Sequence, residues 1–186
     1  MKWDGDNMQI GMFLDRDGVI NEVLSHRVKF VNKPKDFYLL DGVGEAIKLL
    51  NDAGCKVFVV TNQGGIGLGL MKESALDQVH QKMVKDLAKF GARIDDIAYC
   101  PHKPHAGCAC RKPEPQMLVD LAKKHDIDLT NSYMIGDREP DIEAGKRAGT
   151  TTVLVGNREG SFEEADKVFK NLLEFSTWYV RENNSK

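Results

Sequence analysis

The stretch IGMFLDRDGVIN, residues 10–21, decides which fold the sequence predicts. Its apolar start, Ile10 to Leu14, is typical of a strand buried on both faces of a parallel sheet. Two carboxylates, Asp15 and Asp17, follow directly, and Gly18 provides a turn. In open α/β sheets, the crevice beyond the carboxyl ends of the strands binds ligands. A polar loop with an Asx turn is the alternative for this motif taken alone.

Short apolar runs recur along the chain and predict further strands at residues 57–60, 97–99, 133–135 and 151–155. Amphipathic patterns between them predict helices at residues 43–53, 73–90, 114–125 and 139–148. This alternation predicts an α/β fold, a Rossmann-like three-layer sandwich with a central parallel sheet. Residues 21–37 are less regular and are expected to form a flap. A weaker pattern predicts a last helix at about 172–180, followed by a frayed polar tail up to residue 186.

The composition is that of an ordinary globular chain. Its 186 residues are 41% hydrophobic and 29% charged, with a net charge of −2. We expect one domain over residues 1–186, with its core at about 10–155. Nothing in this balance favours a nucleic-acid or membrane partner, and no apolar run approaches the roughly 20 residues of a membrane span. The first residues, MKWDGDNMQIG, lack the apolar part of a signal peptide. We therefore expect a cytoplasmic monomer with a small-molecule partner.

Polar side chains end two other predicted strands as well. Thr61 and Asn62 end the second strand, Asp137 ends the fourth, and Asp141 lies one helical turn further on. Each has an ordinary explanation alone, since Thr and Asn commonly end strands and Asp137 could cap a helix. Together they place several carboxylates at one edge of the sheet, which is unfavourable unless a cation compensates. Oxygen ligands that face a phosphate favour Mg²⁺.

The segment CPHKPHAGCAC, which begins at Cys100, contains a second set of metal-binding residue types. Three thiolates (Cys100, Cys108, Cys110) and one imidazole (His102 or His105) match the tetrahedral N/S ligands of Zn²⁺. A redox-active cysteine pair is the alternative. The reducing cytosol and the lack of a C-x-x-C spacing oppose it. The pattern favours a structural zinc site.

Taken in order, the strand-end motifs resemble those of the haloacid dehalogenase (HAD) superfamily phosphatases. The resemblance covers about residues 10–155 and rests on four motifs: Asp15-x-Asp17-Gly-Val, the apolar strand into Thr61-Asn62, Lys112, and Gly-Asp137-x-x-x-Asp141. It implies a HAD-type fold with a minimal cap. It also implies Mg²⁺-dependent hydrolysis of phosphate monoesters through an aspartyl-phosphate intermediate.

The resemblance gives each acidic residue a role. Asp15 would be the nucleophile, and Asp17 would act as general acid and base. Mg²⁺ would be held by Asp15, Asp137 and the backbone carbonyl of Asp17, and would offset the repulsion between two anions. Asp141 would orient the water shell of the ion or Lys112 rather than touch the ion.

The remaining candidates are basic and polar residues that would contact the substrate. They are Thr61 and Lys112, which would hold the phosphoryl oxygens and count as catalytic, the substrate contacts Asn62, Gln63 and Arg111, and Arg138 as a further candidate. Arg111 would clamp a second anion of the substrate. The alternative is that Arg111 offsets the negative charge of a Cys₃His zinc centre.

Within the superfamily, C-P-H followed by C-x-C resembles a subgroup with a zinc loop directly before Arg-Lys-Pro. This favours His102 over His105 and places the zinc loop at residues 100–110. The subgroup contains heptose 1,7-bisphosphate phosphatases and histidinol-phosphate phosphatases. DRDGVIN and VVTNQGGIGLG favour the 7-phosphate of D-glycero-D-manno-heptose 1,7-bisphosphate. The compact spacing from His102 to Cys108 points toward histidinol phosphate. Leu68 stands where the heptose enzymes have an arginine, which speaks against this particular sugar bisphosphate.

Two more distant functions also fit parts of the sequence. TNQGGIG resembles a polynucleotide 3′-phosphatase, which the near-neutral charge and the zinc loop oppose. A zinc-stabilised interaction module without activity is opposed by the intact catalytic motifs. Among the other residues, we expect Cys55 in the core, His80 solvated or capped on its helix, and the glycines of residues 64–69 in a flexible, phosphate-facing loop.

Overall fold

Buried apolar strands form the middle layer of the structure, a computed structural model that describes residues 8–156 and 164–184. The strands are β1 (Gly11–Leu14), β2 (Lys56–Asn62), β3 (Asp96–Cys100), β4 (Tyr133–Gly136), β5 (Thr151–Val155) and β6 (Lys167–Phe169). Within the described part of the chain they form one sheet of order β3-β2-β1-β4-β5-β6. Every neighbouring pair is parallel.

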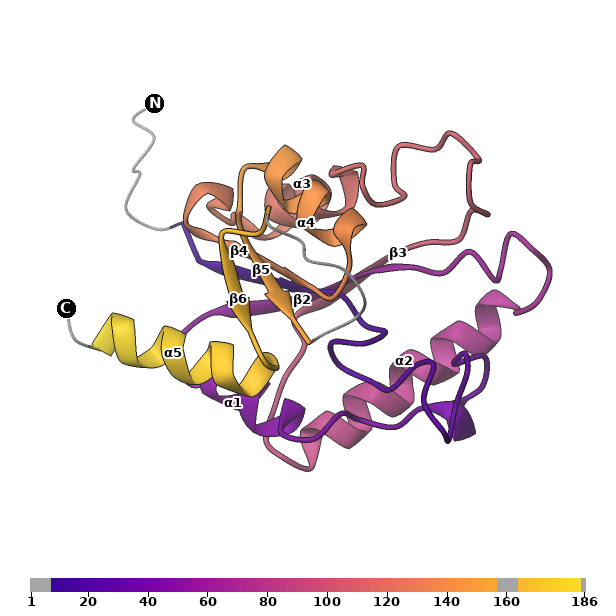
Figure 1. Cartoon of the computed structure of the whole chain (residues 1–186), viewed down its shortest axis with the longest axis horizontal. Coiled ribbons are helices and arrows are strands. Elements are labelled where there is room, and N and C mark those ends of the chain that lie inside the picture. Colours follow the sequence, from indigo (N-terminus) through magenta and orange to yellow (C-terminus); the bar gives the residue numbers. More distant parts are fainter. Residues whose placement is uncertain (1–7, 157–163, 185–186) are drawn as a thin grey trace.

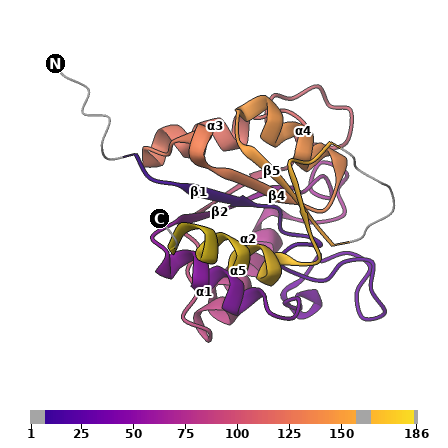
Figure 2. The same cartoon turned by 60° about the vertical axis from the view of Figure 1, so that its left-hand side comes forward.

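Helices cover both faces of this sheet, which confirms the predicted three-layer α/β sandwich (Figures 1 and 2). One face carries α3 (Gln116–His125) and α4 (Glu139–Ala148), and the other carries α1 (Val43–Asp52), α2 (Glu73–Ala88) and α5 (Leu172–Asn184). Two 3₁₀ helices, η1 (Pro34–Asp36) and η2 (Leu129–Asn131), lie in connections.

Each face of the sheet has its own hydrophobic core because strand side chains alternate between the faces. All four residues of β1 are buried. Met12 and Leu14 join the core under α1, α2 and α5, and Phe13 joins the core under α3 and α4. Burial on both faces explains why the strands are recognisable in the sequence as continuous apolar runs.

The strand order reverses between β1 and β4, which makes this point the topological switch of the sheet. Ligands of open α/β sheets bind in the crevice at such a point, beyond the carboxyl ends of the strands. Asp15 follows β1 and Asp137 follows β4, so the topology brings these two motifs to that crevice. The loops after β2 and β3 extend from the same end of the sheet (Figure 1).

The observed elements differ from the predicted ones mainly near the C-terminus. β6 was not predicted because its three residues, Lys-Val-Phe, contain no apolar run and the middle residue is exposed. The prediction of a frayed tail is wrong for residues 181–184, since α5 continues to Asn184. Residues 185–186 lie outside the described part. α3 begins two residues later than predicted because Pro115 is its N-cap residue. The assignment of the whole chain to one domain stays a prediction.

Two further observations concern individual residues and membrane spans. Cys55 is buried beneath α5, as predicted for a small core residue, and its Sγ lies 3.3 Å from the hydroxyl of Tyr179. Within residues 8–156 and 164–184, none of the helices has the length and apolar character that crossing a bilayer requires.

Candidate active site

A buried lysine joins two of the predicted acidic residues. Lys112 Nζ lies 2.8 Å from Asp15 Oδ1 and 2.7 Å from Asp141 Oδ1, and it also donates to the carbonyl of Val60 at 2.7 Å. All three charged side chains are almost fully buried. Lys112 thus lies where it can contact a group that reaches the free side of Asp15.

Burial and neighbouring charges set the protonation of this cluster. Burial, and then the charge of Asp141, raise the pKa of Asp15 to about 7 although Lys112 opposes this. Burial alone would lower the pKa of Lys112, but Asp141 and Asp15 outweigh it and raise that pKa. Lys112 is therefore charged, while Asp15 has more negative charge around it than one lysine can balance.

Three carboxylates converge at the switch point. Asp15, Asp137 and Asp141 each have an oxygen within 4.8 Å of the others, in a group that could hold a metal ion. Asp15 Oδ2 is buried and has no hydrogen-bond partner among the described residues. Asp141 Oδ2 instead accepts from the backbone N–H groups of Asp137 and Arg138, both at 3.2 Å. A buried, oxygen-only donor set with an unused carboxylate oxygen fits a hard cation such as Mg²⁺.

Asp17 lies apart from this group, so the predicted cluster of three or four carboxylates contains three. Its Oδ1 accepts from Arg16 Nη2 at 3.0 Å and Asn21 Nδ2 at 2.9 Å, and its Oδ2 accepts from Gln63 Nε2 at 3.1 Å. Burial would raise the pKa of Asp17, but Arg16 and these hydrogen bonds outweigh it and hold the pKa below its usual value.

The prediction that His80 is solvated or capped is wrong. His80 is only 8% exposed, and its Nε2 lies 3.3 Å from Nη1 of the fully buried Arg16. His80 follows Val79 on the inner side of α2, where the buried guanidinium needs a polar neighbour. Arg16, Asn21 and His80 were missed as site residues. The one available signal was an arginine placed between two strand-end aspartates.

The residues that end β2 brace the other site residues. Thr61 is buried, and its Oγ1 accepts from Gln63 Nε2 at 2.8 Å. Asn62 Oδ1 accepts from the Lys112 N–H, and Asn62 Nδ2 donates to the Lys112 carbonyl, both at 3.0 Å. Asn62 therefore fixes the backbone of Lys112. Both N–H groups of Gln63 are used within the protein, by Thr61 and Asp17.

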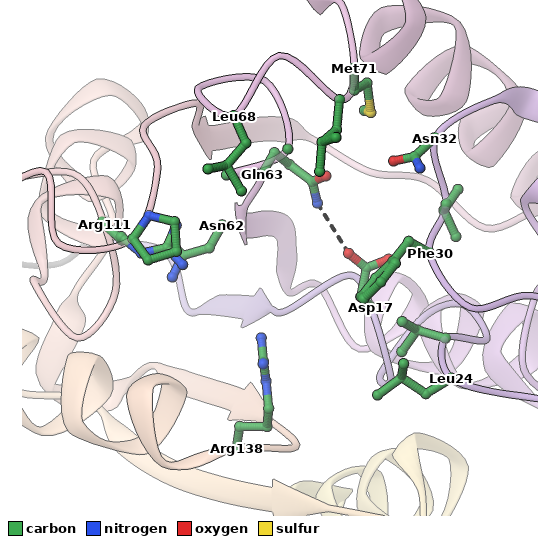
Figure 3. Close-up of a pocket in the computed structure, with 16 residues that line it drawn as sticks. Asp17, Leu24, Phe30, Asn32, Asn62, Gln63, Leu68, Met71, Arg111 and Arg138 are labelled. Carbon is green, nitrogen blue, oxygen red and sulfur yellow. Dashed lines mark hydrogen bonds between the residues drawn. The ribbon is translucent and has the colours of Figure 1, made fainter.

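A pocket of about 290 Å³ opens beside Asp17 (Figure 3). One part of its wall is basic, with Arg111 and Arg138, and another is apolar, with Leu24, Phe30 and Leu68. The apolar residues of the 21–37 segment lie beside the site, in agreement with the predicted flap. Arg111 is held in place because its Nη1 donates to the carbonyl of His102 at 3.2 Å.

The four predicted zinc ligands come together in the loop after β3. Cys100 Sγ lies 3.5 Å from His102 Nδ1 and 3.6 Å from Cys108 Sγ, and His102 Nδ1 lies 3.2 Å from Cys110 Sγ. Tetrahedral Zn²⁺ with bonds of about 2.3 Å to sulfur and about 2.0 Å to nitrogen separates its ligand atoms by about 3.5 to 3.8 Å. A disulfide would need about 2.0 Å between sulfurs. The geometry fits zinc, with His102 positioned to be its nitrogen ligand.

The glycine-rich loop after β2 packs closely on the zinc loop. Gly67 N–H donates to the carbonyl of Pro101 at 2.8 Å. A Cβ at Gly67 would lie 2.5 Å from the backbone nitrogen of Lys103, so only glycine allows this approach. The expectation of a flexible, phosphate-facing loop is wrong for Gly67, which contacts protein backbone.

The arrangement defines a class of protein, because an aspartate directly after a strand at the switch point, with a buried lysine beside it, is the HAD-like hydrolase pattern. A family model described as HAD-hydrolase-like matches residues 109–174. The chain is also 38% identical to the D-glycero-β-D-manno-heptose-1,7-bisphosphate 7-phosphatase of Bordetella bronchiseptica over 168 residues, which covers 87% of this chain and 92% of that protein. The chain belongs to the HAD-like hydrolases, in the family of the heptose-1,7-bisphosphate 7-phosphatases.

Other relatives agree with this assignment. The D-glycero-α-D-manno-heptose-1,7-bisphosphate 7-phosphatase of Campylobacter jejuni is 38% identical over 90% of this chain and 94% of that protein. The crystal structure of the D,D-heptose 1,7-bisphosphate phosphatase of B. bronchiseptica, complexed with magnesium and phosphate, superposes with a TM-score of 0.85 and 36% identity. It covers 94% of this chain and 99% of that one. The chain is thus a phosphoric monoester hydrolase of the HAD type, as the motifs predicted.

Proposed function

We propose that this chain is a Mg²⁺-dependent phosphatase that removes the 7-phosphate of D-glycero-D-manno-heptose 1,7-bisphosphate. The observation that carries the proposal is Asp15, a buried carboxylate with one oxygen on Lys112 and the other unused. Such a group is poised as a nucleophile toward phosphorus. The identity to relatives named for this reaction supports the substrate.

The acidic group fits the expected metal ion. Asp15 and Asp137, with the backbone carbonyl of Asp17, would hold Mg²⁺, and Asp141 holds Lys112 instead. When bound, the ion supplies positive charge that offsets the repulsion between the carboxylate nucleophile and the phosphate. The raised pKa of Asp15 likewise indicates that its negative charge is not fully balanced without a cation.

The side chains divide the chemistry between them. An Asp15 oxygen bonds to phosphorus as the bond from phosphorus to the sugar oxygen breaks, and the protonated form of Asp17 gives that oxygen its proton and becomes the carboxylate. A water oxygen then attacks phosphorus and loses a proton to Asp17, and the bond to Asp15 breaks to release phosphate. Lys112 and Thr61 contact the phosphoryl oxygens during both steps.

The basic wall of the pocket would hold the second phosphate of the substrate. Arg111 and Arg138 line it together, and Arg111 is braced against the zinc loop. Guanidinium groups suit bidentate contacts with phosphate. The zinc ligands Cys100, His102, Cys108 and Cys110 fix the loop that leads into Arg111 and Lys112. Their free thiols suit a reducing cytoplasm, where we place the reaction.

A substrate panel tests the proposal. It contains both anomers of heptose 1,7-bisphosphate, since relatives named for each are equally similar, together with fructose 1,6-bisphosphate, histidinol phosphate and 4-nitrophenyl phosphate. With Mg²⁺, we expect the highest kcat/KM for one heptose anomer, and a loss of about 10⁴-fold or more in Asp15→Asn. A preference for histidinol phosphate would reject the substrate, and turnover by folded Asp15→Asn would reject the nucleophile.

The same panel decides the role of Arg111. Loss of a charge-assisted phosphate contact in Arg111→Ala should lower kcat/KM for the bisphosphate by about 10- to 100-fold. It should leave 4-nitrophenyl phosphate within about threefold, because that ester has no second phosphate. Equal losses on both substrates would instead assign Arg111 to the structure of the zinc loop.

A further inference from the structure

Arg16 is the largest fully buried side chain of the described chain, and the chemistry outlined above gives it no part. A buried guanidinium is costly unless each of its N–H groups has a partner. Arg16 donates to Asp17 through Nη2, at 3.0 Å to Oδ1 and 3.2 Å to Oδ2, and through Nε at 3.3 Å to Oδ1. The fork of the guanidinium therefore lies against one edge of the Asp17 carboxylate.

The remaining edge of the guanidinium contacts His80. Arg16 Nη1 lies 3.3 Å from His80 Nε2. Because arginine only donates hydrogen bonds, Nε2 must be the acceptor and the imidazole must be neutral. Burial, and then the charge of Arg16, lower the pKa of His80 to about 4, which agrees with a neutral ring. A residue of α2 is thus linked through Arg16 to the pocket.

Asp17 is restrained on all sides but one. Asn21 and Gln63 hold its two oxygens along with Arg16, and its side chain is 22% exposed. Asp17 lines the pocket, where its carboxylate and the Gln63 amide lie side by side (Figure 3). The exposed fraction of Asp17 is consequently available to a leaving group in the pocket.

We propose that Arg16, held by His80, is the positioning residue for Asp17 and aims its carboxylate at the leaving-group oxygen. This inference rests on the proposed function, in which Asp17 donates the proton. Proton transfer requires heavy atoms at about 2.6 to 3.2 Å, so a carboxylate free to rotate would lose most of its effect. Asn21 and Gln63 reach one oxygen each, whereas the Arg16 fork contacts both and so fixes the plane of the carboxylate.

The leaving group reveals whether Asp17 is correctly placed. As the phosphorus–oxygen bond breaks, the proton of Asp17 passes to the departing oxygen. The rate increase from this proton transfer grows with the basicity of that oxygen. An alkoxide needs the proton, whereas 2,4-dinitrophenolate leaves without it. The kinetic parameter to compare is kcat/KM, which reports steps up to the first irreversible one and leaves out hydrolysis of the phospho-enzyme.

The experiment measures kcat/KM with Mg²⁺ for a series from 2,4-dinitrophenyl phosphate through phenyl phosphate to a simple alkyl phosphate. In Arg16→Met we expect a loss of about 100-fold for the alkyl ester and less than about threefold for the dinitrophenyl ester, as for loss of general acid catalysis. His80→Leu should give the same trend, about 10-fold at the alkyl end. His80→Gln, which retains an acceptor, should restore the wild-type dependence.

Each outcome separates this inference from the proposed function. If the wild type hydrolyses none of the esters, or Asp15→Asn remains active, the proposed function fails. If the wild type is active but Arg16→Met and His80→Leu lose the same factor on every ester, the positioning role is rejected. If Arg16→Met does not fold, His80→Leu decides the question. If its kcat/KM depends on the leaving group as in the wild type, the inference is overturned, and if that dependence is steeper, the inference is supported.

Discussion

At the scale of single residues, buried charge explains both what could and what could not be predicted. Asp15 and Asp137 follow recognisable motifs, because strand ends place them at the crevice whatever the details of packing. Lys112 follows the cysteine loop in the Arg-Lys-Pro motif. Arg16 and His80 carry no such signal. Their burial depends on a contact between the loop after β1 and α2 across 64 positions of sequence. A histidine on an amphipathic helix is indistinguishable in sequence from a solvated one until its neighbour is known.

The buried His80 predicts a pH dependence of stability. Its pKa is lowered from 6.5 to about 4 on folding, so between these values the unfolded chain binds more protons than the folded one. The contribution of neutral His80 to the free energy of unfolding should therefore be fully present above pH 6.5. It should decrease by about 3 kcal/mol as the pH falls toward 4. Urea unfolding of the wild type and of His80→Gln at several pH values measures this contribution.

The variant His80→Gln should lack that part of the pH dependence. His26→Gln, at an exposed histidine, is the matched control and should retain it. Parallel pH profiles for the wild type and His80→Gln would contradict the assignment.

At the scale of elements, the two loops after β2 and β3 act together. The glycine-rich loop lies on the zinc loop through the Gly67 contact with Pro101 and Lys103, and the zinc loop leads into Arg111 and Lys112. The position of Arg111, which lines the pocket, therefore depends on a close contact between two irregular segments. Sequence patterns could identify each loop but not their contact, because glycine is equally compatible with a flexible loop and with close packing.

Adding one methyl group at Gly67 should force these two loops apart. In Gly67→Ala the new Cβ would lie 2.5 Å from the nitrogen of Lys103 and 2.9 Å from the oxygen of Pro101, so backbone must move. We expect a destabilisation of about 1–3 kcal/mol and a lower kcat/KM for the bisphosphate. Chemical denaturation and steady-state assays measure the two effects.

Gly65→Ala is the matched control for Gly67→Ala. Its Cβ would have Met71 Cβ as nearest neighbour at 3.9 Å, an ordinary contact. A stability close to wild type is expected there. Equal effects at both glycines would show that the contact between the loops is unimportant.

The C-terminal elements illustrate the limit of prediction at this scale. β6 has three residues, and only its pairing with β5 makes it a strand. α5 extends beyond its predicted end because Phe175 and Tyr179 anchor the helix over α1, so its polar last turn continues on a fixed base. Both outcomes depend on tertiary contacts rather than on local pattern.

At the scale of the whole molecule, the parallel sheet and the two candidate metal sites were both predictable, for different reasons. Parallel strands with helical crossovers permit few arrangements, and strand-end residues then meet at one edge. The ligands of the zinc loop lie within eleven consecutive residues and need no long-range information. The shape of the pocket was not predictable, since segments after four different strands contribute to its wall.

Zinc should be a stoichiometric part of the folded protein. Without a cation, burial and the neighbouring thiols of Cys100 and Cys108 raise the pKa of Cys110 to about 12, so the Cys110 thiol stays protonated and the loop lacks its cross-link. Zinc at 100 times its Kd stabilises a folded chain by about 2.7 kcal/mol, which for this size raises Tm by about 5–10 °C.

Elemental analysis should therefore give one zinc per chain, and chelation should lower Tm by that amount. Cys110→Ser should do the same, and Mg²⁺ alone should not restore either sample. Cys55→Ala, outside the loop, should keep its zinc. A metal-free chain with the wild-type Tm would refute the site.

The division of labour between strands and loops has a consequence for how such proteins diversify. The proposed nucleophile Asp15 and the proposed metal ligand Asp137 lie at strand ends of the central sheet, whereas the pocket wall around Leu24, Phe30 and Leu68 comes from irregular segments. Mutations in those segments can change which molecule is accepted while the bond-breaking machinery stays intact. Changes in the pocket wall that leave the sheet unaltered are a route by which one ancestral hydrolase can give rise to enzymes with different substrates.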